Sequence, residues 1–240
     1  MIHLIADLHT HTVASSHSFS TVIEIFEAAR EAGLKAAALT DHGPGMPDAP
    51  HLWHFDTLRM LPDVLSGVRL LRGAEVNLMD WDGTLDLPGA TLGKLDFVIA
   101  SMHPPCLKPG TIKEHTEAWL SLARNPLVDC LGHTGQVEFP YDVGTVVRVC
   151  KETGTLMEIN NNSFVARPGS HENCLAIAAC CAAQGVPVVV NTDAHWAGQV
   201  GHADHAIDLL QSIHFPEELI INADLGRLSD WFWKRKKIKL

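Results

Sequence analysis

Seven short apolar runs alternate with helix-like segments along the chain, and this alternation limits the folds open to it. Nearly continuous apolar strands separated by helices are typical of a parallel sheet that is covered on both faces. A length of 240 residues suits one α/β barrel, and we find no linker or repeat that would divide the chain, so we expect a single domain over 1–240. The runs are "HLIAD" (3–7), "KAAALTDH" (35–42), "VRLLRGAEV" (68–76), "LDFVIASMH" (95–103), "LVDCLGH" (127–133), "GTLMEINNN" (154–162) and "VPVVVNTDAH" (186–195).

The segments between these runs carry helix signals. The first helix should begin at Ser20 or Thr21, bury an apolar stripe and end near Gly33. Further helices are expected over 116–125, 142–154 and 172–185, and a last strand-like piece with a helix over 219–233. The Pro/Gly-rich stretch 43–55 is predicted to be a loop, and 77–89 a small hairpin with a two-residue turn at Asp82-Gly83.

Composition excludes several classes of protein. A formal charge of −10 argues against a nucleic-acid-binding surface, and we interpret the basic tail "KRKKIKL" as solvated. No apolar run reaches the ~18 residues of a membrane span, and "MIHLIADLHT" lacks the features of a signal peptide, so a cytoplasmic protein without membrane contacts is expected. The six cysteines show no zinc-motif spacing and are expected to be reduced and mostly buried.

Metal-ligand residues follow six of the seven strands, which is the most unusual feature of the sequence. In a parallel barrel the carboxyl ends of all strands lie on one face, where barrel enzymes place their chemistry. A single histidine at a strand end is usually structural, but six strand ends bearing ligand-type residues predict a metal site. The residues are His9, His11 and His17 after the first strand, then His42, Glu75, His103 and His133, and finally Asp193 and His195.

Nine such ligands exceed the three or four that one tetrahedral ion uses, and they suffice for three ions if a carboxylate bridges two of them. Nitrogen and oxygen donors suit Zn, Mn or Fe rather than a soft thiolate site. The residue types therefore allow three divalent cations and leave the choice among these metals open.

The motifs "DLHTHT", "LTDHG", "GAEVN", "ASMHPP", "LGHTG" and "NTDAH" resemble the metal motifs of the PHP (polymerase and histidinol phosphatase) superfamily, especially its small stand-alone bacterial phosphatases. The resemblance spans nearly the whole chain, with the motifs in the expected order. It implies a distorted (β/α)7 TIM-like barrel with three divalent metals, zinc the first choice and Mn or Fe the alternatives, in a cleft at the strand ends.

The resemblance also implies a distribution of ligands. His9, His11, Glu75 and Asp193 would bind a first metal, and Glu75, His103 and His133 a second. A third would take His17, His42 and His195.

The expected activity is hydrolysis of phosphomonoesters by hydroxide held between two metals, without a covalent enzyme intermediate. Glu75 and Asp193 would support the catalytic metals, and Arg167 is a candidate for binding a phosphate oxygen. Asp7 is interpreted as orienting a ligand histidine, with backbone anchoring as the alternative. No residue stands out as the general acid for the leaving group.

Other residues in the same loops are open to two interpretations. Asn160 to Asn162 either contact substrate or cap a helix, and His51 and His54 are expected at the surface. Trp53, Trp81 and Trp196 either wall a ring-bearing substrate or pack in the core, and His202 and His205 are expected to be structural. The "DWFW" cluster at 230–233 either closes the barrel base or forms a subunit interface, which leaves the oligomeric state open.

Three rival functions remain. A PHP-type 3'-5' exonuclease or phosphodiesterase would use the same metals, but the sequence lacks basic stripes. A non-catalytic, metal-stabilised binding module is disfavoured because a structural zinc needs four closed ligands. An amidohydrolase-type barrel usually has a bridging modified lysine, and none of the expected strands ends in lysine.

Overall fold

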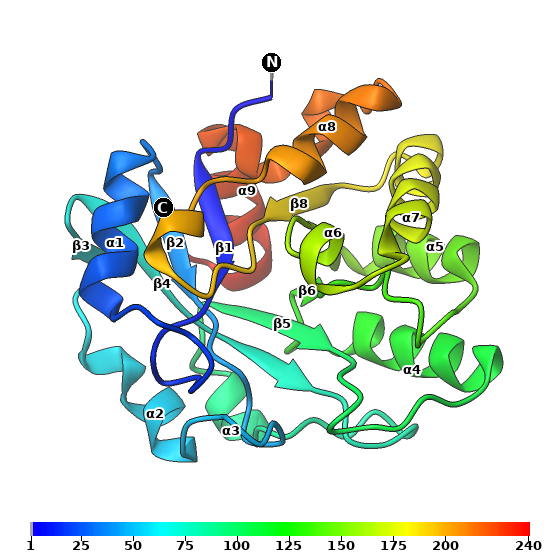
Figure 1. Cartoon of the computed structure of the whole chain (residues 1–240), viewed down its shortest axis with the longest axis horizontal. Helices are drawn as coiled ribbons and strands as arrows, with labels where there is room; N and C mark the ends of the chain where they lie inside the picture. Colours follow the sequence, from blue (N-terminus) through cyan, green and yellow to red (C-terminus); the bar gives the residue numbers. More distant parts are fainter. Residues whose placement is uncertain (1) are drawn as a thin grey trace.

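The computed structural model describes residues 2–240 and forms a nearly closed barrel of seven parallel strands surrounded by helices, which confirms the predicted fold class (Figure 1). The strands follow one another around the sheet in sequence order, and a short antiparallel strand, β3 (Val64–Leu65), pairs with β4. The parallel strands are β1 (Ala6–Thr10), β2 (Ala36–Leu39), β4 (Val68–Asn77), β5 (Phe97–Ser101), β6 (Cys130–Leu131), β7 (Leu156–Asn160) and β8 (Val188–Asn191).

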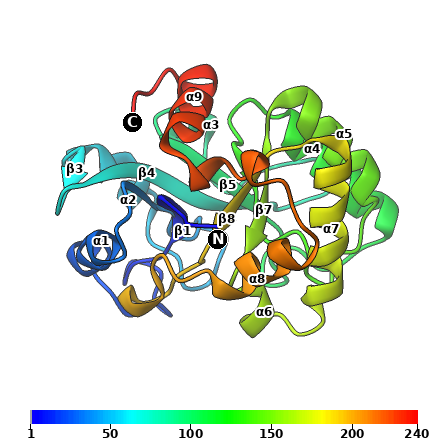
Figure 2. The same ribbon diagram turned by 90° about the horizontal axis from the view of Figure 1, so that it is seen from above.

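Helices occupy the connections between the strands and cover the outside of the barrel, as the view from above shows (Figure 2). They are α1 (Val22–Glu31), α2 (Leu52–Thr57), α3 (Gly89–Leu92), α4 (Ile112–Arg124), α5 (Val143–Thr153), α6 (Ser163–Ala166), α7 (Ser170–Gln184), α8 (Asp204–Ser212) and α9 (Leu225–Lys236). Single 3₁₀ turns lie at Leu58–Met60, Ala197–Gln199, Glu217–Leu219 and Ile221–Ala223. Within residues 2–240, none of these helices combines the length and the apolar character needed to cross a membrane.

Local chemistry explains where α1 begins. Thr21 is its N-cap: the Thr21 hydroxyl accepts the amide N–H of Glu24, and the Glu24 carboxylate accepts the N–H of Thr21. The helix ends before Gly33, which adopts a positive φ of 79° that costs glycine little. Its apolar stripe, including Ile25 and Phe26, is fully buried against the barrel.

The barrel closes between β8 and β1 through an irregular seam. One isolated bridge joins Thr10 to Ala194, and the side chain of Asn222 fills the remaining gap. Its amide nitrogen donates to the carbonyl oxygens of Ala6 and Val190 at 2.8 and 2.6 Å, and its oxygen accepts the N–H of Val190 at 3.0 Å. Asn222 thus satisfies backbone groups that a regular strand pair would have joined.

The inside of the barrel divides into an apolar base and a polar mouth. Leu8, Leu71, Ile99 and Val189 fill the lower interior, and Phe232 of α9 packs beneath them against Phe97, their ring centroids 5.9 Å apart. The "DWFW" cluster therefore closes the barrel base. The side chains of a strand alternate between its two faces. The residues that face the barrel interior therefore line it from the apolar base to the polar mouth at the carboxyl ends of the strands.

Several sequence predictions need correction. The expected loop 43–55 is wrong at its end, since α2 begins at Leu52, and the expected strand-like piece near 220 forms 3₁₀ turns with one bridge to β8. The hairpin at 77–89 exists, but its turn spans 80–83, where the Asp80 carboxylate accepts the N–H groups of Asp82 and Thr84. The basic tail is not wholly solvated, because Arg235 and Lys236 pair with buried Asp129.

Candidate metal centre

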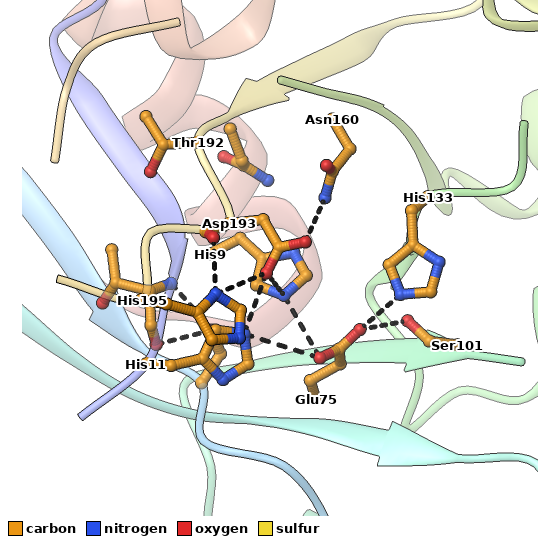
Figure 3. A network of polar contacts seen from close by, with 12 residues as sticks. His9, His11, Glu75, Ser101, His133, Asn160, Thr192, Asp193 and His195 are labelled. Atoms are coloured by element: carbon orange, nitrogen blue, oxygen red, sulfur yellow. Dashed lines mark hydrogen bonds and ion pairs between the residues drawn. The ribbon is translucent and has the colours of Figure 1, made fainter. Parts of the chain in front are cut away.

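Glu75 lies at the centre of the polar mouth, near the end of β4 (Figure 3). Its side chain is 1 % exposed, and imidazole nitrogens of five histidines lie within 3.6 Å of its two carboxylate oxygens. Oε1 lies 2.7 Å from His133 Nε2 and 3.5 Å from His103 Nε2. Oε2 lies 2.9 Å from His42 Nδ1, with His9 and His11 at 3.3 and 3.6 Å. Each oxygen of this one carboxylate therefore faces a different group of imidazoles.

A bulge in β1 turns His9 and His11 into the barrel. The register with β2 pairs Asp7 with Ala37 but Thr10 with Leu39, so β1 has one extra residue between these positions. Before the bulge Leu8 packs in the barrel base; after it, the side chains of His9 and His11 face Glu75 and Asp193. Bulges commonly re-aim side chains in this way beside functional sites.

Asp193 faces the His9 and His11 side of the site from the end of β8. Its Oδ1 lies 3.1 Å from His11 Nε2 and 3.5 Å from His9 Nε2, while its Oδ2 accepts both terminal guanidinium nitrogens of Arg167 at 3.2 Å. His195 follows two residues later, with Nδ1 2.9 Å from the carbonyl oxygen of Asp193. The structure thus brings the predicted residues of β1, β4 and β8 together.

Two of these residues have unusual backbone conformations. His133 and Asp193 adopt positive φ values of 29° and 57°. Such conformations cost a non-glycine residue about 1–3 kcal/mol and tend to persist at functional sites, where the surroundings hold them in place. The strain is consistent with a requirement for both side chains at the mouth.

Buried partners that sequence reasoning missed hold the histidines in place. Glu158 in β7 accepts from His9 Nδ1 at 2.7 Å and from the backbone N–H of His133 at 2.8 Å. Asn77 Oδ1 lies 2.7 Å from His103 Nδ1, and Asn77 is itself held by the carboxylate of Asp86. These contacts fix the ring orientations and leave the other ring nitrogen of each histidine for a ligand.

A signal for Glu158 was available. It precedes Asn160 by two residues in the strand, and both share the barrel face that carries the site. The sequence interpretation noted only the asparagines at the end of this strand. Asn77 and Asp86 carry no comparable signal, because their pairing depends on the hairpin that follows β4.

The electrostatics divide the predicted ligands into two groups. Burial alone would raise the pKa of Glu75, but the imidazoles that face it, His9 first among them, hold it well below its usual value. Burial lowers the pKa of His11 to about 3 and that of His103 well below its usual value. The Glu75 carboxylate and the rings of His11 and His103 are therefore in the forms that metals bind near pH 7. Burial alone would lower the pKa of His9 and of His42, but the carboxylates that face these rings raise both, so a cation bound there would displace a proton.

Orphaned polar atoms provide a test of whether a cation fits. Among the described residues, His9 Nε2, His42 Nδ1 and Glu75 Oε2 are buried without a hydrogen-bond partner, although they lie next to one another. Leaving buried polar groups unpaired costs about 1–3 kcal/mol each, so a native structure normally satisfies them. A divalent cation among them would do so, and the donor set of nitrogen and oxygen suits Zn, Mn or Fe.

The mouth opens into a cavity of about 270 Å³, lined by His17, His42, Met46, His103, Asn162, Ala166, Arg167 and His195. His17 is the most exposed of the predicted ligands, with 49 % of its side chain accessible, and it contacts the carboxylate of Asp48. Trp53, Trp81 and Trp196 are not among the residues that line this cavity. Trp81 instead packs against His115, with ring centroids 5.4 Å apart.

Other predicted roles change in the structure. Asp7 does not orient a histidine ring among the described residues; it accepts from the backbone of Thr192 and Gly201, which ties β1 to the end of β8. His54 is only partly exposed, with 23 % of its side chain accessible, and its Nε2 contacts buried Asp41 at 3.1 Å. His51 is exposed as expected and caps α2.

Asn160, the last residue of β7, and Asn162 lie in different surroundings. Asn160 contacts Glu158 and Asp193 through its amide nitrogen and caps α6 through its oxygen, which accepts the N–H of Ser163. Asn162 lines the cavity. His202 and His205 are exposed, in or before α8.

Comparison with known proteins shows which family this barrel represents: a PHP domain model matches residues 7–162, and the chain belongs to the PHP family. Among its relatives, a probable phosphatase of Acetivibrio thermocellus is 45 % identical over 236 residues, covering 98 % of both chains. A probable phosphatase of Clostridium botulinum is 42 % identical over 235 residues, covering 98 % of this chain and 97 % of the relative.

The fold also resembles a solved structure, histidinol phosphate phosphatase from Lactococcus lactis in complex with zinc, L-histidinol and phosphate. The TM-score is 0.62 at 18 % sequence identity, and the match covers 88 % of this chain and 94 % of that one. At this identity the likeness supports the fold.

Proposed function

We propose that this protein is a metal-dependent phosphatase that hydrolyses small phosphomonoesters, and that the whole chain acts as one catalytic unit. The observation that carries the proposal is the position of Glu75, whose two oxygens face two different groups of imidazoles. Asp193, which is paired with Arg167, lies beside them. This arrangement suits two neighbouring cations with a shared carboxylate, as in many enzymes that hydrolyse phosphate esters. The names of the relatives point to the same activity.

The proposed ligand sets follow the geometry and the resemblance. His9, His11, Glu75 and Asp193 would hold one ion, and Glu75, His103 and His133 a second. His17, His42 and His195 surround the outer part of the cavity and would hold a third. When bound, the ions would supply positive charge for the phosphoryl oxygens and an activated water as nucleophile.

The chain's own residues would complete the reaction site. Arg167 lines the cavity and would bind a phosphate oxygen, since a guanidinium matches phosphate geometry. Glu158 and Asn77 would keep His9 and His103 in the required orientation through their Nδ1 contacts. A buried, partly enclosed mouth would limit the access of bulk water to the reacting centre.

A monoester fits this cavity better than a nucleic acid. Its volume of about 270 Å³ is close to the lower end of small-molecule sites, which span roughly 300–1,000 Å³. Among the described residues that line it, Arg167 is the only lysine or arginine. A polynucleotide would need further cations along its backbone, and the chain has a net charge of −10.

Turnover of p-nitrophenyl phosphate and bis-p-nitrophenyl phosphate by metal-replete protein tests the proposal. We expect hydrolysis of the monoester, much slower hydrolysis of the diester, and loss of activity with a chelator. Metal analysis should find about three divalent ions per chain. Diester turnover equal to or above monoester turnover would contradict a phosphomonoesterase, and inactivity at full metal content would favour a binding module.

A further inference from the structure

Asp48 faces His17 across the cavity rim, from the loop between β2 and α2. Its Oδ2 lies 2.6 Å from His17 Nδ1, and its side chain is only 18 % exposed although His17 is 49 % exposed. Neither the motifs nor the family resemblance assigns a role to this carboxylate. The contact joins two loops that are far apart in sequence, at the most exposed of the predicted ligands.

Asp48 also belongs to a compact group of metal-binding side chains. One ligand atom each of His17, His42 and Asp48 lies within 4.8 Å of the others. His42 takes part in a second group of this kind with His11 and His195. The outer part of the site therefore contains a carboxylate, which the set of three histidines lacks.

The loop that carries Asp48 is fixed by contacts that do not involve its carboxylate. The carbonyl oxygen of Asp48 accepts the N–H of Ser16 at 3.0 Å, and the N–H of Gly45 donates to Asp86 at 2.8 Å. A Cβ atom at Gly45 would lie 2.7 Å from the sulfur of Met79, so the loop packs closely on the hairpin below. Asp48 can therefore be substituted with little effect on the loop's path.

We propose that Asp48 is a positioning residue for the outermost metal ion and controls its affinity through His17. A carboxylate that accepts the Nδ1–H of an imidazole fixes the tautomer and the orientation of the ring and leaves Nε2 for a cation. It also places a negative charge beside an ion whose other proposed ligands are neutral. This inference rests on the proposed trinuclear site and extends it to a residue outside the nine ligands.

Metal titration of Asp48→Ala, Asp48→Asn and wild-type protein tests the proposal. Removing such a partner typically weakens metal binding by about 10- to 100-fold. We expect wild type to retain three Zn ions per chain after gel filtration, and Asp48→Ala to retain two. Asp48→Asn, which keeps an acceptor oxygen but loses the charge, should be intermediate. Asp230→Ala, at an exposed position of α9, is the control for the same change in net charge.

Cobalt substitution separates positioning from direct ligation. At saturating Co²⁺, Asp48→Ala should reach three ions with the visible absorption envelope of wild type, because the ligand atoms are unchanged. A changed envelope at saturation would show that Asp48 is itself a ligand and overturn the positioning role. Equal zinc retention in Asp48→Ala and wild type would overturn the proposal while leaving the trinuclear site intact. A wild type that binds fewer than three ions at saturation would refute the trinuclear site, and this inference with it.

Discussion

Glu75→Gln is the most informative single substitution, because it changes one oxygen of the carboxylate that both proposed inner ions share. Glutamine keeps the volume of the side chain and can offer one oxygen, but its nitrogen cannot bind a cation. The oxygens that it would replace lie 2.7 Å from His133 Nε2 and 2.9 Å from His42 Nδ1, at a position that is 1 % exposed. One of the two ions would therefore lose an anionic ligand, and for the ion held by His103 and His133 that ligand is the only one with a negative charge.

The structure indicates the size of the effect. Removing one partner of a buried charge pair costs roughly 3–5 kcal/mol, which corresponds to a loss of affinity of roughly 100- to several-thousand-fold. Loss of the bridging carboxylate would also misplace the reacting groups, which lowers the turnover rate on the order of 100-fold. We expect Glu75→Gln to contain at least one ion fewer than wild type and to lose at least about 99 % of its monoesterase activity.

Glu158→Gln is the matched control, because Glu158 is equally buried but contacts the Nδ1 side of His9 rather than the centre of the site. We expect it to reach full metal content at saturation, with affinity weakened about 10- to 100-fold. Metal analysis, phosphatase assays and circular dichroism on both variants separate the two roles. Normal turnover and full metal content in Glu75→Gln would refute the bridging role.

Four further outcomes are expected. Arg167→Ala should raise KM for the monoester roughly 10- to 100-fold with metal content unchanged, since charge-assisted hydrogen bonds contribute about 1.5–3 kcal/mol; a metal analysis and a saturation curve measure both. Asn222→Ala should lower the free energy of unfolding by about 3 kcal/mol or more in urea titrations, because three buried backbone groups at the seam lose their partner. Chelation should lower Tm, and added zinc should restore it, because each site filled at 100 times its Kd adds about 2.7 kcal/mol to the free energy of unfolding. Thiol labelling of the folded protein at pH 8 should be fast at Cys180 only. Burial raises the pKa of Cys106 to about 11 and that of Cys150 to about 12, so the thiolate fraction of each is on the order of 0.1 % or less. Rapid labelling of either would contradict this burial.

The main residues of the site could be predicted from sequence because each lies at or just after a strand end. A parallel barrel collects strand ends at one mouth whatever the details of its loops, so His103 and His133 can be placed together from the order of apolar runs alone. Loop partners are different. Asp48 meets His17, and Asp86 meets Asn77, only because particular loops fold back over the mouth. No periodicity in the sequence encodes those meetings.

The β1 bulge shows a second kind of limit. The pattern His-x-His correctly predicts that His9 and His11 share a face, but strict alternation from the buried Leu8 would direct His9 away from the barrel interior. One extra residue in the register with β2 reverses this alternation between the base and the mouth. The inward-facing residues of β1 therefore follow one alternation at the barrel base and the opposite alternation at the mouth. Hydrophobic patterning alone does not reveal this change.

This separation of base and mouth determines how variants of the protein should behave. The base is filled by Leu8, Leu71, Ile99 and Val189 and closed by Phe232, none of which is among the proposed ligands. The mouth stores strain at His133 and Asp193 and leaves Glu75 Oε2 without a hydrogen-bond partner, so its residues add little to the stability of the barrel itself. Substitutions at the mouth should therefore change metal binding and activity with small effects on the stability of the metal-free protein, and substitutions at the base should do the opposite. A barrel divided in this way can keep a costly cluster of histidines and carboxylates because its stability is supplied elsewhere.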